Sequence, residues 1–298
     1  MASFDFSLMQ SLAAEEKGEY HETPKHVVVH IPGKDRLLVG FDNLSWNREE
    51  GPRKPWAFDV ARKNGWGVVG VMCKKSDWFR DLALFRILEG MRDCGVFSSY
   101  PAVSMYGSSM GAYGACAFAD LAPGCTVVAF SPQSTLAKDL APFENRYDRA
   151  ANRADWSQGP YRDAATGLAA AGKAYLVYDP LVPEDQAHID RLTQPNCEVL
   201  GWNHLTHKVP PSLKRMEILK PVSTEMLDGS MTRQRFYELL RNRRNAIPYT
   251  LRLLEQAAAK GHMKLALSAT AYARSQKDNW KLRQFQKHLK AQAKERGL

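Results

Sequence analysis

Short, almost continuously apolar runs recur through most of the chain and limit the folds it can adopt. Each run has five to seven residues, and segments with helical spacing separate them; the runs cover residues 26–31, 36–41, 66–72, 102–106, 125–130, 174–178 and 197–202. Strands of this kind are buried on both faces, as in a mostly parallel sheet covered by helices. We therefore predict an α/β fold with a doubly wound, mostly parallel sheet.

The length of the chain, 298 residues with 44% hydrophobic residues, allows one large domain that carries an appendage. The strand pattern ends near residue 228, so we predict an α/β domain over residues 1–228 and a helical extension over residues 229–298. Residues 131–172 interrupt the alternation of strands and helices. We expect this insertion to form a lid or substrate wall at the edge of the sheet, or a structured excursion without substrate contact.

The C-terminal extension is strongly basic. We expect helices at residues 232–242, 248–260, 263–275 and 280–296. Residues 230–298 hold 16 Lys and Arg against 4 Asp and Glu, a net charge of +12, whereas the rest of the chain has −3. Such segregation suggests attraction to an anionic polymer or partner protein. A solvated helical face explains the same charges, and both interpretations stay open.

Several classes of protein are excluded by what the sequence lacks. It has no run of about 18 apolar residues, so we expect no transmembrane segment. The N-terminus does not resemble a secretory signal, and the five cysteines form no CxxC pair. The sequence also lacks a GxxxxGK[ST] phosphate loop and an HExxH zinc motif. We expect a cytoplasmic protein that needs no cofactor and no metal.

One motif carries recognisable chemistry: Gly107-Ser108-Ser109-Met110-Gly111, between a predicted strand and a predicted helix. A sharp strand-to-helix turn exposes its central side chain above the sheet and requires small residues on either side. The helix N-terminus favours a developing negative charge. We therefore predict Ser109 as a nucleophile, because Ser108 has the wrong offset from the two glycines.

This motif and the order of strands resemble the nucleophile elbow and core of the α/β-hydrolase superfamily over about residues 25–220. The resemblance implies a Ser-acid-His triad in that chain order. For the acid we favour Asp179, which directly follows a predicted strand, with Asp185 as the alternative. For the base we favour His207, which precedes a predicted helix, over His204.

An oxyanion hole in this superfamily needs two backbone N–H groups. The resemblance implies Met110 as one donor and Asn43 as the other, with Leu44 next. The usual His-Gly or Gly-Gly pair is absent from the loop that holds Asn43, which argues against the common lipases and carboxylesterases.

Four side chains in loops at the same predicted edge are candidates to line a substrate pocket: Trp46, Arg48, Arg53 and Trp78. Arginines beside tryptophans can hold a carboxylate, a phosphate or a sugar. These arginines and tryptophans could equally well stack on one another at the protein surface without binding a substrate.

The sequence thus predicts a serine hydrolase that cleaves an ester or thioester through an acyl-enzyme. An acyltransferase would use the same triad with an alcohol in place of water. A third interpretation is a non-catalytic scaffold whose basic helices bind an anionic polymer or a partner protein.

Overall fold

The computed structural model describes residues 4–43 and 51–295 of the chain. The strands are β1 (Glu19–Glu22), β2 (His26–Ile31), β3 (Arg36–Phe41), β4 (Gly67–Cys73), β5 (Ala102–Ser108), β6 (Thr126–Phe130), β7 (Lys173–Tyr178) and β8 (Cys197–Gly201). The helices before β8 are α1 (Ser7–Glu15), α2 (Phe58–Lys63), α3 (Leu82–Asp93), α4 (Met110–Ala117), η2 (Ala119–Leu121), α5 (Asp148–Ala151), α6 (Ala164–Leu168) and α7 (Pro183–Leu192). The helices after it are α8 (Val209–Arg215), α9 (Leu219–Leu227), α10 (Arg233–Leu239), η3 (Leu240–Asn245), α11 (Ile247–Ala259), α12 (Met263–Gln276) and α13 (Trp280–Glu295).

The strands of the described residues form one sheet in the order β1-β2-β4-β3-β5-β6-β7-β8. β1 and β2 pair antiparallel, and so do β2 and β4, whereas the pairs from β4 through β8 are parallel. Every residue of β4 is buried, as expected for a strand covered on both faces. The parallel strands end at a common edge, where ligand sites of open α/β sheets lie.

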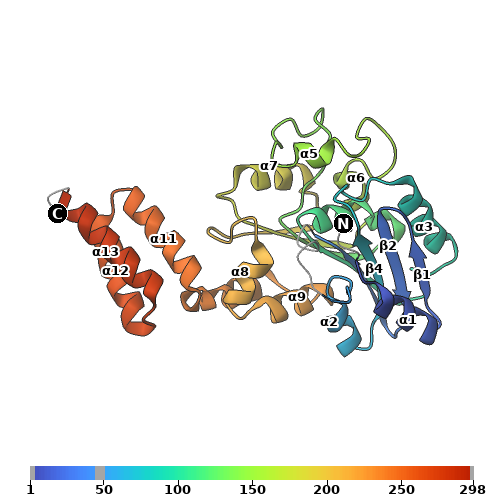
Figure 1. The fold of residues 1–298 in the computed structure, drawn as a ribbon, viewed down its shortest axis with the longest axis horizontal. Coiled ribbons are helices and arrows are strands. Elements are labelled where there is room, and N and C mark those ends of the chain that lie inside the picture. Colours follow the sequence, from blue (N-terminus) through green and yellow to red (C-terminus); the bar gives the residue numbers. More distant parts are fainter. Residues whose placement is uncertain (1–3, 44–50, 296–298) are drawn as a thin grey trace.

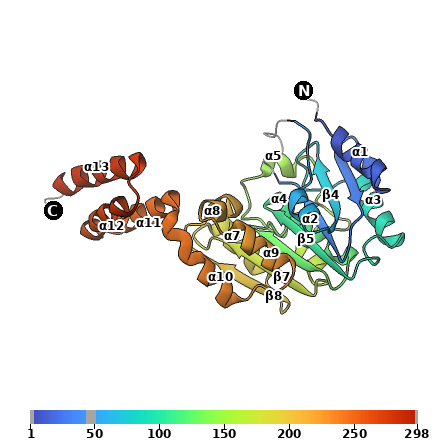
Figure 2. The same cartoon turned by 90° about the horizontal axis from the view of Figure 1, so that it is seen from below.

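Helices cover both faces of the sheet (Figures 1 and 2). α3, α4 and α6 bury their apolar side chains in one core, and α1, α2, α8 and α9 bury theirs in a second core on the opposite face. All eight residues of α4 are buried, and its glycines and alanines let this helix lie close to the sheet. The doubly wound, mostly parallel α/β fold predicted from the sequence is confirmed.

The C-terminal helices predicted from the sequence are also present. α11, α12 and α13 extend away from the sheet and pack against one another (Figures 1 and 2). They share a small apolar cluster around Met263, Ala266 and Leu289. Phe236 of α10 and Tyr249 of α11 instead join the core beneath α8 and α9. The division at residue 228 stays a prediction, and the apolar core of the body continues beyond it.

Two elements differ from the expected pattern. β1 has a half-buried, polar sequence at the edge of the sheet, so no apolar run marks it. The helix predicted after His207 is broken between α8 and α9, where Glu217 has a φ of +63°. None of the described helices combines the length and apolar character that crossing a membrane requires.

Candidate active site

The turn between β5 and α4 holds Ser109 in a strained backbone conformation. Its φ is +55° and its ψ is −120°, a region that residues with a Cβ atom rarely adopt. The Ser109 N–H donates a hydrogen bond to the carbonyl oxygen of Phe130 on β6, at 2.8 Å. This bond ties the turn to the neighbouring strand.

The two glycines of the motif are required by close backbone contact. A Cβ atom added to Gly107 would lie 2.1 Å from the carbonyl oxygen of Gly111. A Cβ atom added to Gly111 would lie 2.4 Å from the carbonyl oxygen of Phe41, at the end of β3. Strand and helix therefore meet at a distance that only glycine permits, as the motif predicts.

His207 lies in the loop between β8 and α8, and its imidazole contacts the serine. His207 Nε2 is 2.8 Å from Ser109 Oγ. Its side chain is 24% exposed, so the imidazole borders solvent while one edge faces the protein. The structure therefore brings together the favoured serine and the favoured histidine.

The carboxylate that contacts His207 is Asp185, not the favoured Asp179. Both oxygens of Asp185 lie within 2.9 Å of His207 Nδ1, and its side chain is fully buried in the first turn of α7. Because a carboxylate accepts hydrogen bonds, Nδ1 carries the proton and Nε2 is left to accept one. The Ser109 hydroxyl can then donate to Nε2.

Asp179 has a different position. Its Oδ1 accepts a hydrogen bond from the Leu181 N–H at 2.9 Å, and its Oδ2 accepts one from the Thr206 N–H at 2.6 Å. The first of these bonds forms an Asx-turn, in which an aspartate side chain binds the backbone N–H two residues further on. The second fixes the residue next to His207. Asp179 thus shapes the loop, and the expectation that it contacts His207 is wrong.

His204, the alternative base, lies away from Ser109 at the junction with the C-terminal helices. Its carbonyl oxygen accepts hydrogen bonds from Arg252 at 2.6 and 3.1 Å, and its ring packs edge-on against Tyr249. Burial lowers the pKa of His204. These contacts join the loop of His207 to α11.

A network of charges from the insertion supports Asp185. Arg146 Nη1 lies 2.8 Å from Asp185 Oδ1, and its Nη2 lies 2.5 Å from Glu144 Oε2. Glu144 also accepts a hydrogen bond from Nε2 of His188, which is fully buried. Nδ1 of the same histidine accepts a hydrogen bond from the Ser134 N–H. Burial alone would raise the pKa of Glu144, but hydrogen bonds from His188 and Arg146 lower it to about 2. Burial lowers the pKa of His188, which matches its neutral role.

Tyr147, the next residue, contacts His207, and no local pattern in the sequence predicts this contact. Its hydroxyl lies 3.0 Å from His207 Nε2, the same nitrogen that contacts Ser109. Its ring lies against Trp78, with centroids 4.9 Å apart. The insertion at residues 131–172 therefore contributes a hydroxyl directly to the site.

The predicted oxyanion donors lie at the start of α4 and at the end of β3. Met110 is the first residue of α4, where backbone N–H groups have no partner within the helix. Asn43 follows Phe41 and Asp42, whose carbonyl oxygens would lie 2.4 and 2.7 Å from a Cβ atom added to Gly111. Its loop therefore runs beside the first turn of α4. The alternative donor, Leu44, lies outside the described residues.

Two of the four pocket candidates, Trp46 and Arg48, also lie outside the described residues. The Arg53 side chain is 1% exposed and binds Asp42 at 2.5 Å and the Cys73 carbonyl oxygen at 2.7 Å, so it supports the sheet edge beneath the surface. Trp78 is fully buried, and its indole N–H donates to Gln133 at 3.3 Å. Trp78 packs behind the ring of Tyr147 and does not line an open surface.

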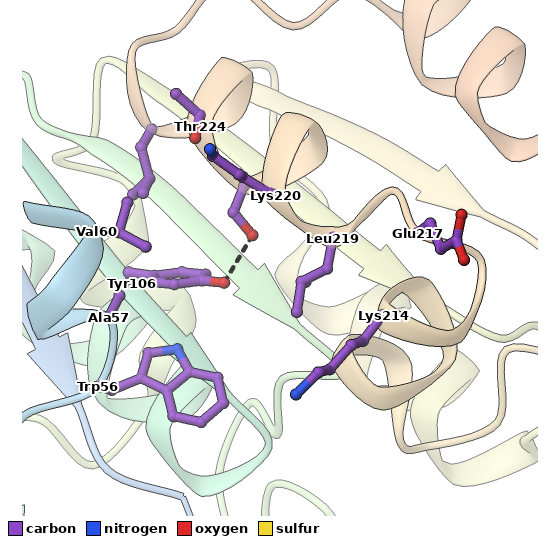
Figure 3. A pocket seen from close by; sticks show the side chains of 11 residues that line it. Trp56, Ala57, Val60, Tyr106, Lys214, Glu217, Leu219, Lys220 and Thr224 are labelled. Atoms are coloured by element: carbon purple, nitrogen blue, oxygen red, sulfur yellow. Dashed lines mark hydrogen bonds between the residues drawn. The ribbon is translucent and has the colours of Figure 1, made fainter. Parts of the chain in front are cut away.

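An apolar cavity of about 480 Å³ lies apart from this site, between α2 and α9 (Figure 3). Trp56, Tyr106 and Leu219 line it, and the Tyr106 hydroxyl is 2.8 Å from the Ser223 hydroxyl. Its lining includes none of the residues around Ser109. Within residues 4–43 and 51–295, no cluster of histidine, cysteine or acidic side chains has the arrangement of a metal site.

Taken together, the doubly wound sheet, the strained serine turn and the chain order Ser109, Asp185, His207 have the form of an α/β-hydrolase. No family model matches the sequence, and no curated protein matches it.

Solved structures with a similar fold include several enzymes. Acetyl xylan esterase 1 from Thermoanaerobacterium sp. JW/SL YS485 is 15% identical, with 76% of this chain and 94% of that chain covered and a TM-score of 0.46. The capsule O-acetyltransferase of Neisseria meningitidis serogroup A is 8% identical, with 70% and 94% covered and a TM-score of 0.45. MPT51 (FbpC1) of Mycobacterium tuberculosis is 11% identical, with 71% and 97% covered and a TM-score of 0.45. At identities this low, function has to be inferred from the geometry of the site.

Proposed function

We propose that this protein transfers an acyl group from a carboxylic ester or thioester to water or to an acceptor alcohol, through an acyl-enzyme on Ser109. The observation that carries the proposal is the chain of contacts from Ser109 Oγ to His207 Nε2, at 2.8 Å, and from His207 Nδ1 to Asp185, at 2.8 Å. A serine in this arrangement can attack a carbonyl while the histidine takes its proton.

Each residue of the site has a defined role in the reaction. Ser109 Oγ forms a bond to the carbonyl carbon as its proton moves to His207 Nε2. The Met110 N–H, with a donor near Asn43, holds the negative oxygen that develops. The C–O or C–S bond to the leaving group then breaks as His207 returns the proton to the leaving atom. Water or an alcohol then attacks the acyl-enzyme by the same steps in reverse order: its proton passes to His207 and then to Ser109 Oγ, as the bond between the acyl group and Ser109 breaks. Asp185 stabilises the imidazolium in both halves.

A fluorophosphonate probe tests this proposal, because it modifies serines whose nucleophilicity depends on such a histidine. We expect the wild-type chain to be labelled, and labelling to be lost in Ser109→Ala. Ser108→Ala is the matched control, since Ser108 lies beside the nucleophile at the end of β5, and it should keep its labelling. A folded wild type that stays unlabelled and cleaves no ester would refute the enzyme and favour a binding scaffold.

Hydrolysis and transfer are separated by the fate of the acyl group. An aryl acetate supplies the acyl-enzyme, and increasing concentrations of an alcohol compete with water for it. A rise in acetylated alcohol at the expense of acetate would identify an acyltransferase. Acetate formation that added alcohol does not divert would identify a hydrolase.

A further inference from the structure

Two hydroxyl groups approach one nitrogen at this site. His207 Nε2 is 2.8 Å from Ser109 Oγ and 3.0 Å from the Tyr147 hydroxyl. Because Nδ1 carries the proton that faces Asp185, Nε2 has a single lone pair and can accept from one of them fully. The nucleophile needs only one acceptor, so the second hydroxyl calls for an explanation.

The structure holds Tyr147 firmly in this position. Trp78 lies against one part of its ring, and the guanidinium of Arg146 lies 5.3 Å from its ring centre. Arg146 is itself fixed by Glu144 and Asp185. The insertion is thus attached to the same carboxylate that orients His207, and the tyrosine is positioned relative to the imidazole.

Tyr147 can act only as a hydrogen-bond donor or acceptor near neutral pH. Burial raises its pKa above the ordinary value for a tyrosine, so the phenol stays protonated. Once Ser109 has given its proton to Nε2, that nitrogen becomes a donor and can no longer accept from Tyr147. The Tyr147 O–H is then available to another oxygen.

The position of Nε2 identifies that oxygen. In acyl transfer the protonated histidine gives its proton to the leaving group, so the leaving oxygen lies next to Nε2. The carbonyl oxygen lies on the other side of the reacting carbon, toward the N–H of Met110. A hydroxyl 3.0 Å from Nε2 is therefore within reach of the leaving oxygen.

We propose that Tyr147 is a catalytic residue that donates a hydrogen bond to the departing alkoxide and, in the second half of the reaction, holds the incoming water or alcohol oxygen. The proposal rests on the acyl transfer proposed above. It adds a substrate class, because an alkoxide of a poorly acidic alcohol gains from such a bond and a stable phenolate does not. The structure thus points to esters of aliphatic or sugar hydroxyls. Tyr147 transfers no proton: the C–O bond breaks as the proton on Nε2 passes to the leaving oxygen.

The test compares Tyr147→Phe with wild type on acetates of alcohols of increasing acidity, from ethanol through phenol to p-nitrophenol. The measured quantity is kcat/KM, which reports steps up to release of the alcohol. We expect a loss of roughly 10- to 100-fold on ethyl acetate and less than about threefold on p-nitrophenyl acetate. If the wild type cleaves only aryl acetates, phenyl and p-nitrophenyl acetate form the pair, and the loss should again be larger for the poorer leaving group.

Other roles for Tyr147 give other patterns. If Tyr147 were an oxyanion donor, Tyr147→Phe would lower kcat/KM equally on all the acetates and would also slow labelling by the fluorophosphonate. A purely structural ring would show no change in Tyr147→Phe, which keeps the contact with Trp78. Either pattern overturns the proposal.

Labelling keeps the two proposals distinguishable. Tyr147→Phe should be labelled at the wild-type rate, because fluoride is a good leaving group. If the wild type itself is not labelled and cleaves no acetate, the acyl-transfer proposal fails and takes this one with it. If the wild type is labelled and cleaves acetates, but the effect of Tyr147→Phe on kcat/KM does not depend on the leaving group, only the role of Tyr147 fails.

Discussion

At the scale of single residues, the environments of two carboxylates near His207 separate their roles. Asp185 is fully buried and faces His207 and Arg146. Asp179 accepts two backbone N–H groups and holds the loop in which His207 lies. One orients the imidazole directly, and the other fixes the backbone that carries it.

Substitution by asparagine should distinguish them. Asp185→Asn removes the acceptor that sets the His207 tautomer, and we expect kcat/KM for an ester to fall by roughly 10³- to 10⁴-fold. Asp179→Asn keeps one acceptor oxygen and loses one backbone hydrogen bond. We expect it to lower the free energy of unfolding by about 1–3 kcal/mol and kcat/KM by less than about tenfold.

The measurements are ester cleavage and urea unfolding on both variants. Both substitutions have the same size and charge change, so each serves as the control for the other. A larger loss of kcat/KM in Asp179→Asn than in Asp185→Asn would mean that Asp179 is the acid after all.

The sequence pointed to the serine and the histidine that are in contact in the structure, but not to the other residues of the candidate site. Ser109 is marked by a strand, two glycines and a helix, and His207 by its place before α8. Asp179 and Asp185 share one loop and helix start, and only the course of that chain in space decides which reaches the histidine. Tyr147 and Arg146 lie in a segment without periodic pattern, so nothing local relates them to β5.

At the scale of elements, the strands were predictable because their apolar character is almost continuous. β2 and β3 begin and end at the predicted residues, and the other predicted strands agree within two residues. β1 was missed because an edge strand that is exposed on one side needs few apolar residues. The break at Glu217 was missed because a positive φ in a residue other than glycine leaves no mark in the sequence.

The contact between α4 and β3 leads to a prediction about the elbow. Gly111→Ala would place a Cβ atom 2.4 Å from the Phe41 carbonyl oxygen, which is backbone and cannot turn aside. We expect the free energy of unfolding to fall by about 2–4 kcal/mol, in the range of other backbone clashes, as measured by urea denaturation.

The matched control is Gly90→Ala, in the third turn of α3. An added Cβ atom at Gly90 meets nothing within 4 Å. Because alanine favours a helix over glycine, this variant should gain about 0.5–1 kcal/mol. Equal effects of the two substitutions would show that close packing does not explain Gly111.

At the scale of the whole molecule, the chain combines an α/β body with a basic arm. α11, α12 and α13 extend from the side of the body that carries α8 and α10 (Figure 2). Arg252 of α11 donates to the carbonyl oxygen of His204, and Trp202 donates to the Tyr249 hydroxyl at 3.0 Å. These bonds join the arm to the loop of His207.

The charges on α13 are arranged in a line. Arg283, Lys287, Lys290 and Lys294 are all exposed and follow the spacing of one helical face, over about 16 Å. Arg283 binds Asp278 at 2.7 Å, whereas none of the three lysines has an ion pair among the described residues. Like charges at this spacing repel one another, and an anionic polymer laid along the helix would relieve that repulsion.

We therefore predict that the arm binds a linear polyanion such as heparin in a manner sensitive to salt. The triple substitution Lys287→Gln, Lys290→Gln and Lys294→Gln should reduce the slope of log Kd against log salt concentration by roughly three, about one for each lost contact. A control with Lys63, Lys75 and Lys220 changed to Gln removes the same charge from exposed positions on the body. If both triple variants lose affinity alike, net charge alone attracts the polymer and the line of lysines on α13 is a solvated face. A loss confined to the α13 variant, with ester cleavage unchanged in both, would identify the arm as the part that brings the acyl-transfer site to an anionic polymer.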